Sequence, residues 1–302
     1  MCIFSRPVIS VKDTQIFARP TGAGSQFLAY QMGYESAEEN AMILPLPVSL
    51  PAHEGSVRFI DLKNYEAFFL DLDKGFPYKS PVVSIGCSAP QALNADGSML
   101  EVFEVGNYIA SFVPTLDDFS RIDPRFSLPK EAWEQVPQYL DYGFAVFQLA
   151  SGSSRPHPMA FEFETESKSV YFPTMHIHDG DVHEREDFDH VLYAQHAGFD
   201  SVVHGYVNSD VNDKSTGLVR SKHVASRFCS ISKTEGLVDG NLLVHRKVIR
   251  GQHPNQDTEF FAAGDPVKAA FNMRPLLSYA PWLFVVAACA WFFRRRNRIR
   301  KA

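Results

Sequence analysis

Short apolar or alternating stretches, separated by polar breaks, fill most of the first 250 positions of the chain. The clearest lies at residues 27–34, as in a strand with one face against a core. Its two faces are Phe27, Ala29, Gln31 and Gly33 on one side and Leu28, Tyr30, Met32 and Tyr34 on the other. Gly-rich and acidic turns separate these stretches. Strands are therefore predicted within residues 7–48, 81–113, 142–149, 159–164, 169–173 and 241–249.

Three segments instead have helical spacing or helix-start signals. Residues 61–72 carry apolar side chains every three or four positions, which predicts a helix. Thr115 precedes two acidic residues and predicts a short helix to Phe119. Pro129 opens a third, residues 130–140, which should break near Pro137. The expected fold class is α+β, mainly antiparallel β and sandwich-like, with two or three short helices.

The end of the chain has a different pattern, an uncharged run followed by cations. Residues 276–293 contain 18 consecutive uncharged, mostly apolar residues, which as a helix would cover about 27 Å, close to the hydrocarbon thickness of a bilayer. Residues 294–302 carry six Lys or Arg. We expect a β-rich domain at 1–250, a stalk at 251–275, one transmembrane helix at 276–293 and a basic tail at 294–302.

The charged residues are also distributed unevenly between the basic tail and the rest of the chain. The tail holds six of the 29 cations, so the remaining 23 face 35 acidic residues, a net charge of −12. Such a domain repels nucleic acid, and none is expected as a partner. The expected partners are the lipid bilayer through residues 276–293 and anionic lipid through the Arg tail. A protein partner or ligand is not specified by the sequence.

The positive-inside rule places the tail in the cytoplasm and the domain on the other side of the membrane. Residues 1–7 contain neither a basic nor an apolar leader region. Two localisations therefore stay open: an extracytoplasmic domain whose leader lies upstream, and a tail-anchored protein with a cytosolic domain.

The densest polar cluster is residues 176–190, which contain four of the 11 His. If residues 171–178 form a strand, His176 and His178 project from the same face, and His183 or Glu184 could add a ligand after the intervening turn. A Zn, Mn or Fe site is one interpretation. The other, favoured by the loose spacing, is an acidic solvated loop whose His side chains bond to neighbouring Asp residues.

A second candidate is Cys2. Removal of Met1 would expose its thiol beside a free amine, the arrangement of N-terminal-nucleophile hydrolases. Phe17–Arg19 on the next predicted strand is superficially similar to the bile-salt and penicillin-acylase-like amidases, but the acidic residue that follows the Arg there is absent. The alternative is a core or disulfide cysteine, and the four Cys show no paired or metal-type spacing.

The order of several motifs resembles an uncharacterised bacterial family, a domain of unknown function whose members are exported and often end in a membrane helix with a basic tail. The resemblance covers residues 2–180 and the anchor, and it implies export and architecture but no catalytic residue. The family's usual leader is absent here. The motifs are Cys2, Pro7–Val8, Phe27–Gln31, Ile43–Pro47, Val105–Tyr108, Tyr142–Phe144 and Tyr171–Pro173.

These observations predict a membrane-anchored envelope protein with a binding or scaffolding domain. Two alternatives stay open, a metal-dependent enzyme using residues 176–190 and a hydrolase using Cys2.

Overall fold

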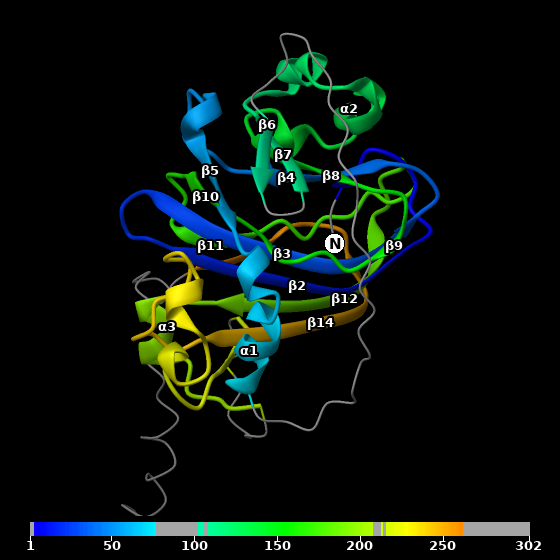
Figure 1. Cartoon of the computed structure of the whole chain (residues 1–302). Helices are drawn as coiled ribbons and strands as arrows, with labels where there is room; N and C mark the ends of the chain where they lie inside the picture. Colours follow the sequence, from blue (N-terminus) through cyan, green and yellow to red (C-terminus); the bar gives the residue numbers. More distant parts are fainter. Residues whose placement is uncertain (1–2, 77–101, 106–107, 208–212, 214–215, 262–302) are drawn as a thin grey trace, which may run out of the picture. The chain divides into compact units, whose positions relative to one another are not determined.

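The computed structural model describes residues 3–76, 102–105, 108–207, 213 and 216–261 (Figure 1). Its strands are β1 (Ile3–Phe4), β2 (Ser10–Pro20), β3 (Ser25–Ser36), β4 (Asn40–Leu46), β5 (Val57–Asp61), β6 (Val102–Val105), β7 (Tyr108–Val113), β8 (Gly143–Leu149), β9 (Gly152–Ser154), β10 (Met159–Glu164), β11 (Ser169–Phe172), β12 (Arg185–Ala194), β13 (Val219–Arg220), β14 (His245–Pro254) and β15 (Thr258–Phe261). Its α-helices are α1 (Phe68–Lys74), α2 (Lys130–Glu134) and α3 (Ala197–Val202). Short 3₁₀ helices are η1 (Glu54–Ser56), η2 (Lys63–Tyr65), η3 (Leu116–Arg121), η4 (Pro124–Phe126), η5 (Pro137–Tyr139), η6 (Ala225–Arg227) and η7 (Ile231–Lys233).

The strands form two large sheets and one small one. The first has five strands in the order β1-β4-β8-β7-β6, all antiparallel. The second has eight, in the order β13-β14-β12-β2-β3-β10-β5, with β9 paired to β3. In this second sheet β12 pairs with β2 in parallel, so the sheet is mixed. β11 and β15 make a separate antiparallel pair.

The main core lies between the two large sheets because alternate residues of each strand point to opposite faces. On β2, Ile16 and Ala18 belong to this core, together with residues of β4, β7 and β8 from the other sheet. Phe59 packs edge to face on Phe147 across the interface, with ring centroids 5.6 Å apart. The prediction of a mainly β domain with a few short helices is therefore confirmed.

Each sheet is also covered on its outer face. Phe17, between the two core residues of β2, points to a second cluster with α1 and residues 225–244. Residues 116–139, which include α2, cover the outer face of the five-stranded sheet. Figure 1 shows α2 beyond β7 and β8, and α1 on the outer side of β2 and β12. As a result β3, β4 and β8 are buried along nearly their whole length, whereas β14 at the edge is mostly exposed or half-buried.

The helix predicted at 61–72 begins later than expected. β5 continues to Asp61, η2 follows, and α1 starts only at Phe68. Asp61 pairs with Met159 of β10, so the helical part starts after it and is divided into η2 and α1 by a turn at residues 66–67. The segment 130–140 divides as predicted into α2 and η5 around Pro137, whose ring nitrogen cannot donate a helical hydrogen bond.

Two segments near the end of the domain are more structured than the sequence indicated. Residues 185–190, interpreted as part of a solvated loop, form the first part of β12, and the predicted stalk begins inside β14 and includes β15. The β structure thus continues to residue 261 instead of ending at 250. Within the described ranges no helix is both long and apolar enough to cross a membrane, and the span predicted at 276–293 lies outside them.

Candidate site at the buried histidines

Three histidines come together where the segment after β11 crosses β12. His176 and His178 lie two residues apart in an extended segment held by neighbouring chain: Phe4 N donates to Ile177 O at 3.0 Å, and Val8 N donates to His178 O at 3.0 Å. Asn255 fixes the same segment, since its side chain accepts from His176 N at 2.7 Å and donates to His176 O at 2.9 Å. His190 projects from β12 toward this segment, so two distant parts of the sequence build the cluster.

The three imidazole rings form a stack with His176 in the centre. Its ring centroid lies 5.1 Å from that of His178, with planes 17° apart, and 5.1 Å from that of His190, with planes 20° apart. Phe188 stacks on His176 at 4.3 Å, and Phe4 meets His178 edge to face at 5.7 Å. The rings thus contact one another through their faces, as aromatic core residues do.

Burial keeps His176 and His178 in this stack uncharged at neutral pH. His176 and His190 are fully buried, and their ring nitrogens have no hydrogen-bond partner within the described residues. Desolvation lowers the pKa of His176 far below its ordinary value, with the neighbouring His178 adding to the effect. Desolvation also lowers the pKa of His178 to about 4, against an opposing contribution from Asp179. The imidazoles of His176 and His178 are therefore neutral, and all three rings act as packing groups.

The structure separates His183 and Glu184 from the stack. Both are exposed, and His183 Nε2 lies 3.0 Å from Asp179 Oδ2, a contact that raises the pKa of His183. Among the residues that the structure describes, no three His, Cys, Asp or Glu side chains are arranged to hold a metal ion. The four predicted ligands therefore divide into a stacked pair, His176 and His178, and an exposed pair, His183 and Glu184. The solvated-loop interpretation holds for His183 and is wrong for His176, His178 and His190.

Beside the stack lies a buried carboxylate that sequence reasoning missed, because Asp257 falls in the predicted stalk. Its Oδ2 accepts from the hydroxyls of Tyr139 at 2.7 Å and Tyr171 at 2.8 Å. Its Oδ1 accepts from the backbone N–H of Thr174 at 2.9 Å and of Met175 at 3.0 Å. Burial raises the pKa of Asp257, whereas the four donors act in the opposite direction. Asp257 thereby joins η5, β11 and the histidine segment to the β14–β15 turn.

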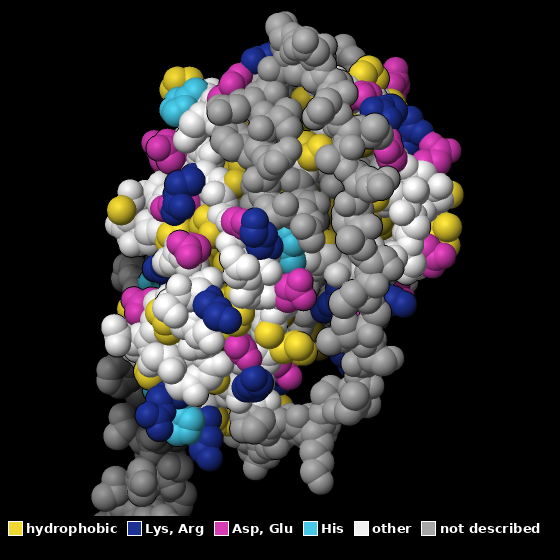
Figure 2. Space-filling model, viewed as in Figure 1, with side chains coloured by type: hydrophobic (Ala, Val, Ile, Leu, Met, Phe, Trp, Pro, Cys, Tyr) yellow, Lys and Arg dark blue, Asp and Glu magenta, His cyan; other side chains and the backbone are white. Residues whose placement is uncertain are grey.

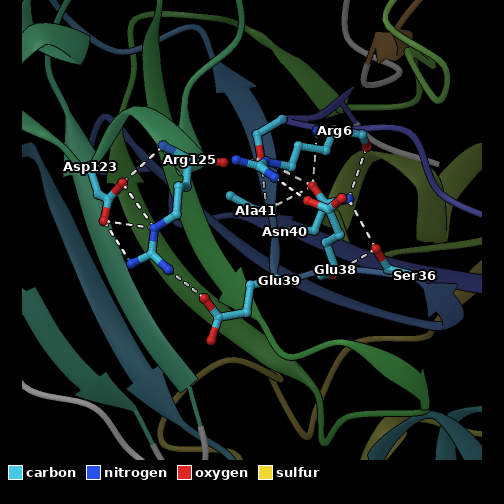
Figure 3. A network of polar contacts seen from close by, with 9 residues as sticks. Arg6, Ser36, Glu38, Glu39, Asn40, Ala41, Asp123 and Arg125 are labelled. Carbon is cyan, nitrogen blue, oxygen red and sulfur yellow. Dashed lines mark hydrogen bonds and ion pairs between the residues drawn. The ribbon is translucent and has the colours of Figure 1, made fainter.

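A polar network at the start of β4 also holds segments of the chain together, as Asp257 does (Figure 3). The Asn40 side chain accepts from Arg6 N at 3.1 Å and donates to Arg6 O at 2.9 Å, while Arg6 also pairs with Glu38. Arg125 binds Asp123 at 2.7 Å and Glu39 at 2.6 Å, which ties η4 to the β3–β4 turn. Every charge drawn there has an opposite partner, so the network offers no free group for chemistry.

Of the cysteines, the structure describes Cys229, which is buried and free. Desolvation raises the pKa of its thiol to about 12, so it is not a reactive thiolate at neutral pH. Cys2, the predicted nucleophile, lies outside the described residues.

No family model matches the chain, so the resemblance to the uncharacterised bacterial family is not supported by a family model. Among solved structures, baculovirus P35 is similar with a TM-score of 0.43 and 15% identity, over 86% of this chain and 99% of that one. P35 in its caspase-8 complex gives a TM-score of 0.42 and 13% identity, over 83% of this chain and 96% of that one. At these values the likeness is distant and assigns neither a family nor a function.

Proposed function

We propose that the protein is a single-pass membrane protein whose β-rich domain binds a partner protein. The anchor in this proposal is residues 276–293 with the basic tail after them, on the length and charge criteria given above. The domain in this proposal lies outside the cytoplasm. Binding, and not catalysis, is supported best because the buried histidines and Asp257 serve packing, and an open sheet edge is available on the surface.

That open edge, on β14, is the observation that carries the proposal. On one side β14 pairs with β12 along its full length, from His245 to Pro254. On the other side β13 pairs only with residues 245 and 246. Within the described part of the chain, residues 247–253 have no strand partner on this outer side. An unpaired edge presents backbone N–H and C=O groups that an extended peptide can bind as an added strand.

A groove of about 340 Å³ follows this edge. β14 contributes Lys247 and Val248 to its wall, and β15 forms the opposite wall. Val248 is 47% exposed, although it lies in the sheet. The Lys247 ammonium lies 5.3 Å from the Phe260 ring centroid; it forms no close ion pair among the described residues, although the charge of Asp213 attracts it. Asp257 and Glu259 also line the groove, so the extended partner segment in this proposal places its acidic side chain at Lys247 and not against these carboxylates.

A photocrosslinking side chain at position 248 tests the edge in intact cells. We expect a discrete crosslinked product from position 248 and none from position 70 on α1, which is 58% exposed and serves as the control. Lys247→Glu should reduce the product at 248, because it places a negative charge opposite the acidic segment. Equal products at both positions would remove the edge from the proposal, and the lack of any product at 248 would overturn the binding function.

The anchor is tested separately by alkaline extraction of membranes. The full chain should stay in the membrane fraction, whereas a chain ending at Arg274 should be released. Protease added to intact cells should digest the domain if it lies outside the cytoplasm. Release of the full chain by alkali, or protection of the domain, would contradict the corresponding part of the proposal.

A further inference from the structure

A second hollow lies on another part of the surface, at the end of α1. Its volume is about 470 Å³. The backbone N–H of Lys222 donates to Gly75 O at 3.1 Å, which joins the segment that contains Lys222 to the end of α1. A Cβ at Gly75 would lie 2.6 Å from Phe228 Cζ, so glycine lets this ring pack directly on the backbone. The lining residues are Lys74, Gly75, Lys222, His223, Arg227 and Phe228.

The hollow gathers cations without including an acid in its wall. Lys74 pairs with Asp71, a residue of α1 that does not line the hollow. Lys222 and Arg227 have no ion-pair partner among the described residues. By contrast, seven arginines of the described chain do pair with carboxylates, namely Arg6, Arg58, Arg121, Arg125, Arg155, Arg246 and Arg250.

This concentration of positive charge stands out because the chain before its basic tail carries a net charge of −12. Figure 2 shows cationic and acidic side chains interspersed over the face that it presents, in keeping with pairing elsewhere on the surface. Two unpaired cations that share a hollow are not needed to balance neighbouring acids. They are free to bind an anion that comes from outside the chain.

From this arrangement we propose that the hollow binds a phosphomonoester. The Arg227 guanidinium can donate two parallel hydrogen bonds to phosphate oxygens, and Lys222 and Lys74 add positive charge. The Phe228 ring supplies an apolar wall. Because the volume is much larger than one phosphate ion requires, the organic part of the ligand lies against this ring. The site is independent of the β14 edge.

Calorimetric titration of the full chain in detergent micelles tests phosphomonoester binding with three probes. Phenyl phosphate should bind saturably, inorganic phosphate more weakly, and phenol not at all. Arg227→Ala should weaken phenyl phosphate binding about tenfold or more, and Arg227→Lys by less, since lysine retains charge but not the paired donors. Lys233→Ala is the matched control, because Lys233 is an exposed cation close by in the sequence that does not line the hollow. It should change binding less than about twofold.

Three outcomes would overturn the proposal: no saturable binding of phenyl phosphate, equal losses in Arg227→Ala and Lys233→Ala, or equal binding of phenol. Because Arg227 is exposed, its replacement should leave the melting temperature unchanged. Lys222→Glu provides a second variant and should abolish binding. A phosphotyrosine peptide that binds more tightly than phenyl phosphate would extend the ligand class to phosphorylated proteins, and equal affinity would restrict recognition to the phosphomonoester itself.

Discussion

The buried histidines make the stability of the domain depend on pH, and His178 allows the size of the effect to be worked out. Its pKa is about 4 in the folded protein and 6.5 when exposed. The unfolded state therefore binds more protons between these values, so stability is fully present above pH 6.5 and is lost as the pH falls toward 4. The loss from this one group is about 2 kcal/mol at pH 5 and about 3 kcal/mol at pH 4. His176 adds to the loss in the same direction.

Urea unfolding of the full chain in detergent at pH 7.5, 6 and 5 measures the effect. His178→Leu removes the titrating ring, so its free energy of unfolding should fall between pH 7.5 and 5 by about 2 kcal/mol less than that of the parent. His183→Gln is the control: the folded pKa of the exposed His183 is raised, so its loss cannot flatten the acid slope. An unchanged slope in His178→Leu would refute the reasoning that burial keeps the stack neutral.

Three further replacements test the packing, each measured by urea unfolding at pH 7.5. Asp257→Ala leaves the backbone N–H groups of Thr174 and Met175 without an acceptor and leaves the hydroxyls of Tyr139 and Tyr171 with only Met175 Sδ and Pro45 O. It should cost about 3 kcal/mol, whereas a loss below about 1 kcal/mol would show that the carboxylate does not hold these segments together. Gly143→Ala places a methyl group 2.5 Å from Phe112 Cζ and should cost about 1–3 kcal/mol; a neutral result would mean that the ring moves freely. Phe147→Ala empties the space between the sheets and should cost about 3–5 kcal/mol, with an exposed site such as Leu70→Ala as the control within about 0.5 kcal/mol.

The sequence predicts the fold class well because most strands have a pattern that local spacing reveals. β3, β4, β8 and β10 all fall within the predicted stretches. The parallel pairing of β2 with β12 could not be predicted, since it joins residues 176 positions apart, such as Thr14 and His190. The helix predicted at 61–72 is divided into η2 and α1 by a turn at residues 66–67, and the three- and four-residue spacing of its apolar residues does not mark this break.

The histidine site shows a different limit of prediction from the sequence. His176 and His178 do lie close together, as their spacing predicts, but their surroundings decide their chemistry. β12 was missed because its buried His190 counts as polar in a hydrophobicity pattern, although a neutral imidazole packs as a ring. Had His190 been taken as apolar, the alternation Phe188, His190, Leu192 would have indicated a strand with one buried face.

The pairing of β2 with β12 also determines when the eight-stranded sheet can be completed during synthesis. β2 is made among the first residues, yet its neighbour on one side is complete only at Ala194, and the outermost long strand of that sheet only at Pro254. Until then β2 presents an open edge, which favours aggregation. A chain that stops before residue 185 cannot complete the sheet, so this domain is not divisible into an independently folding first half.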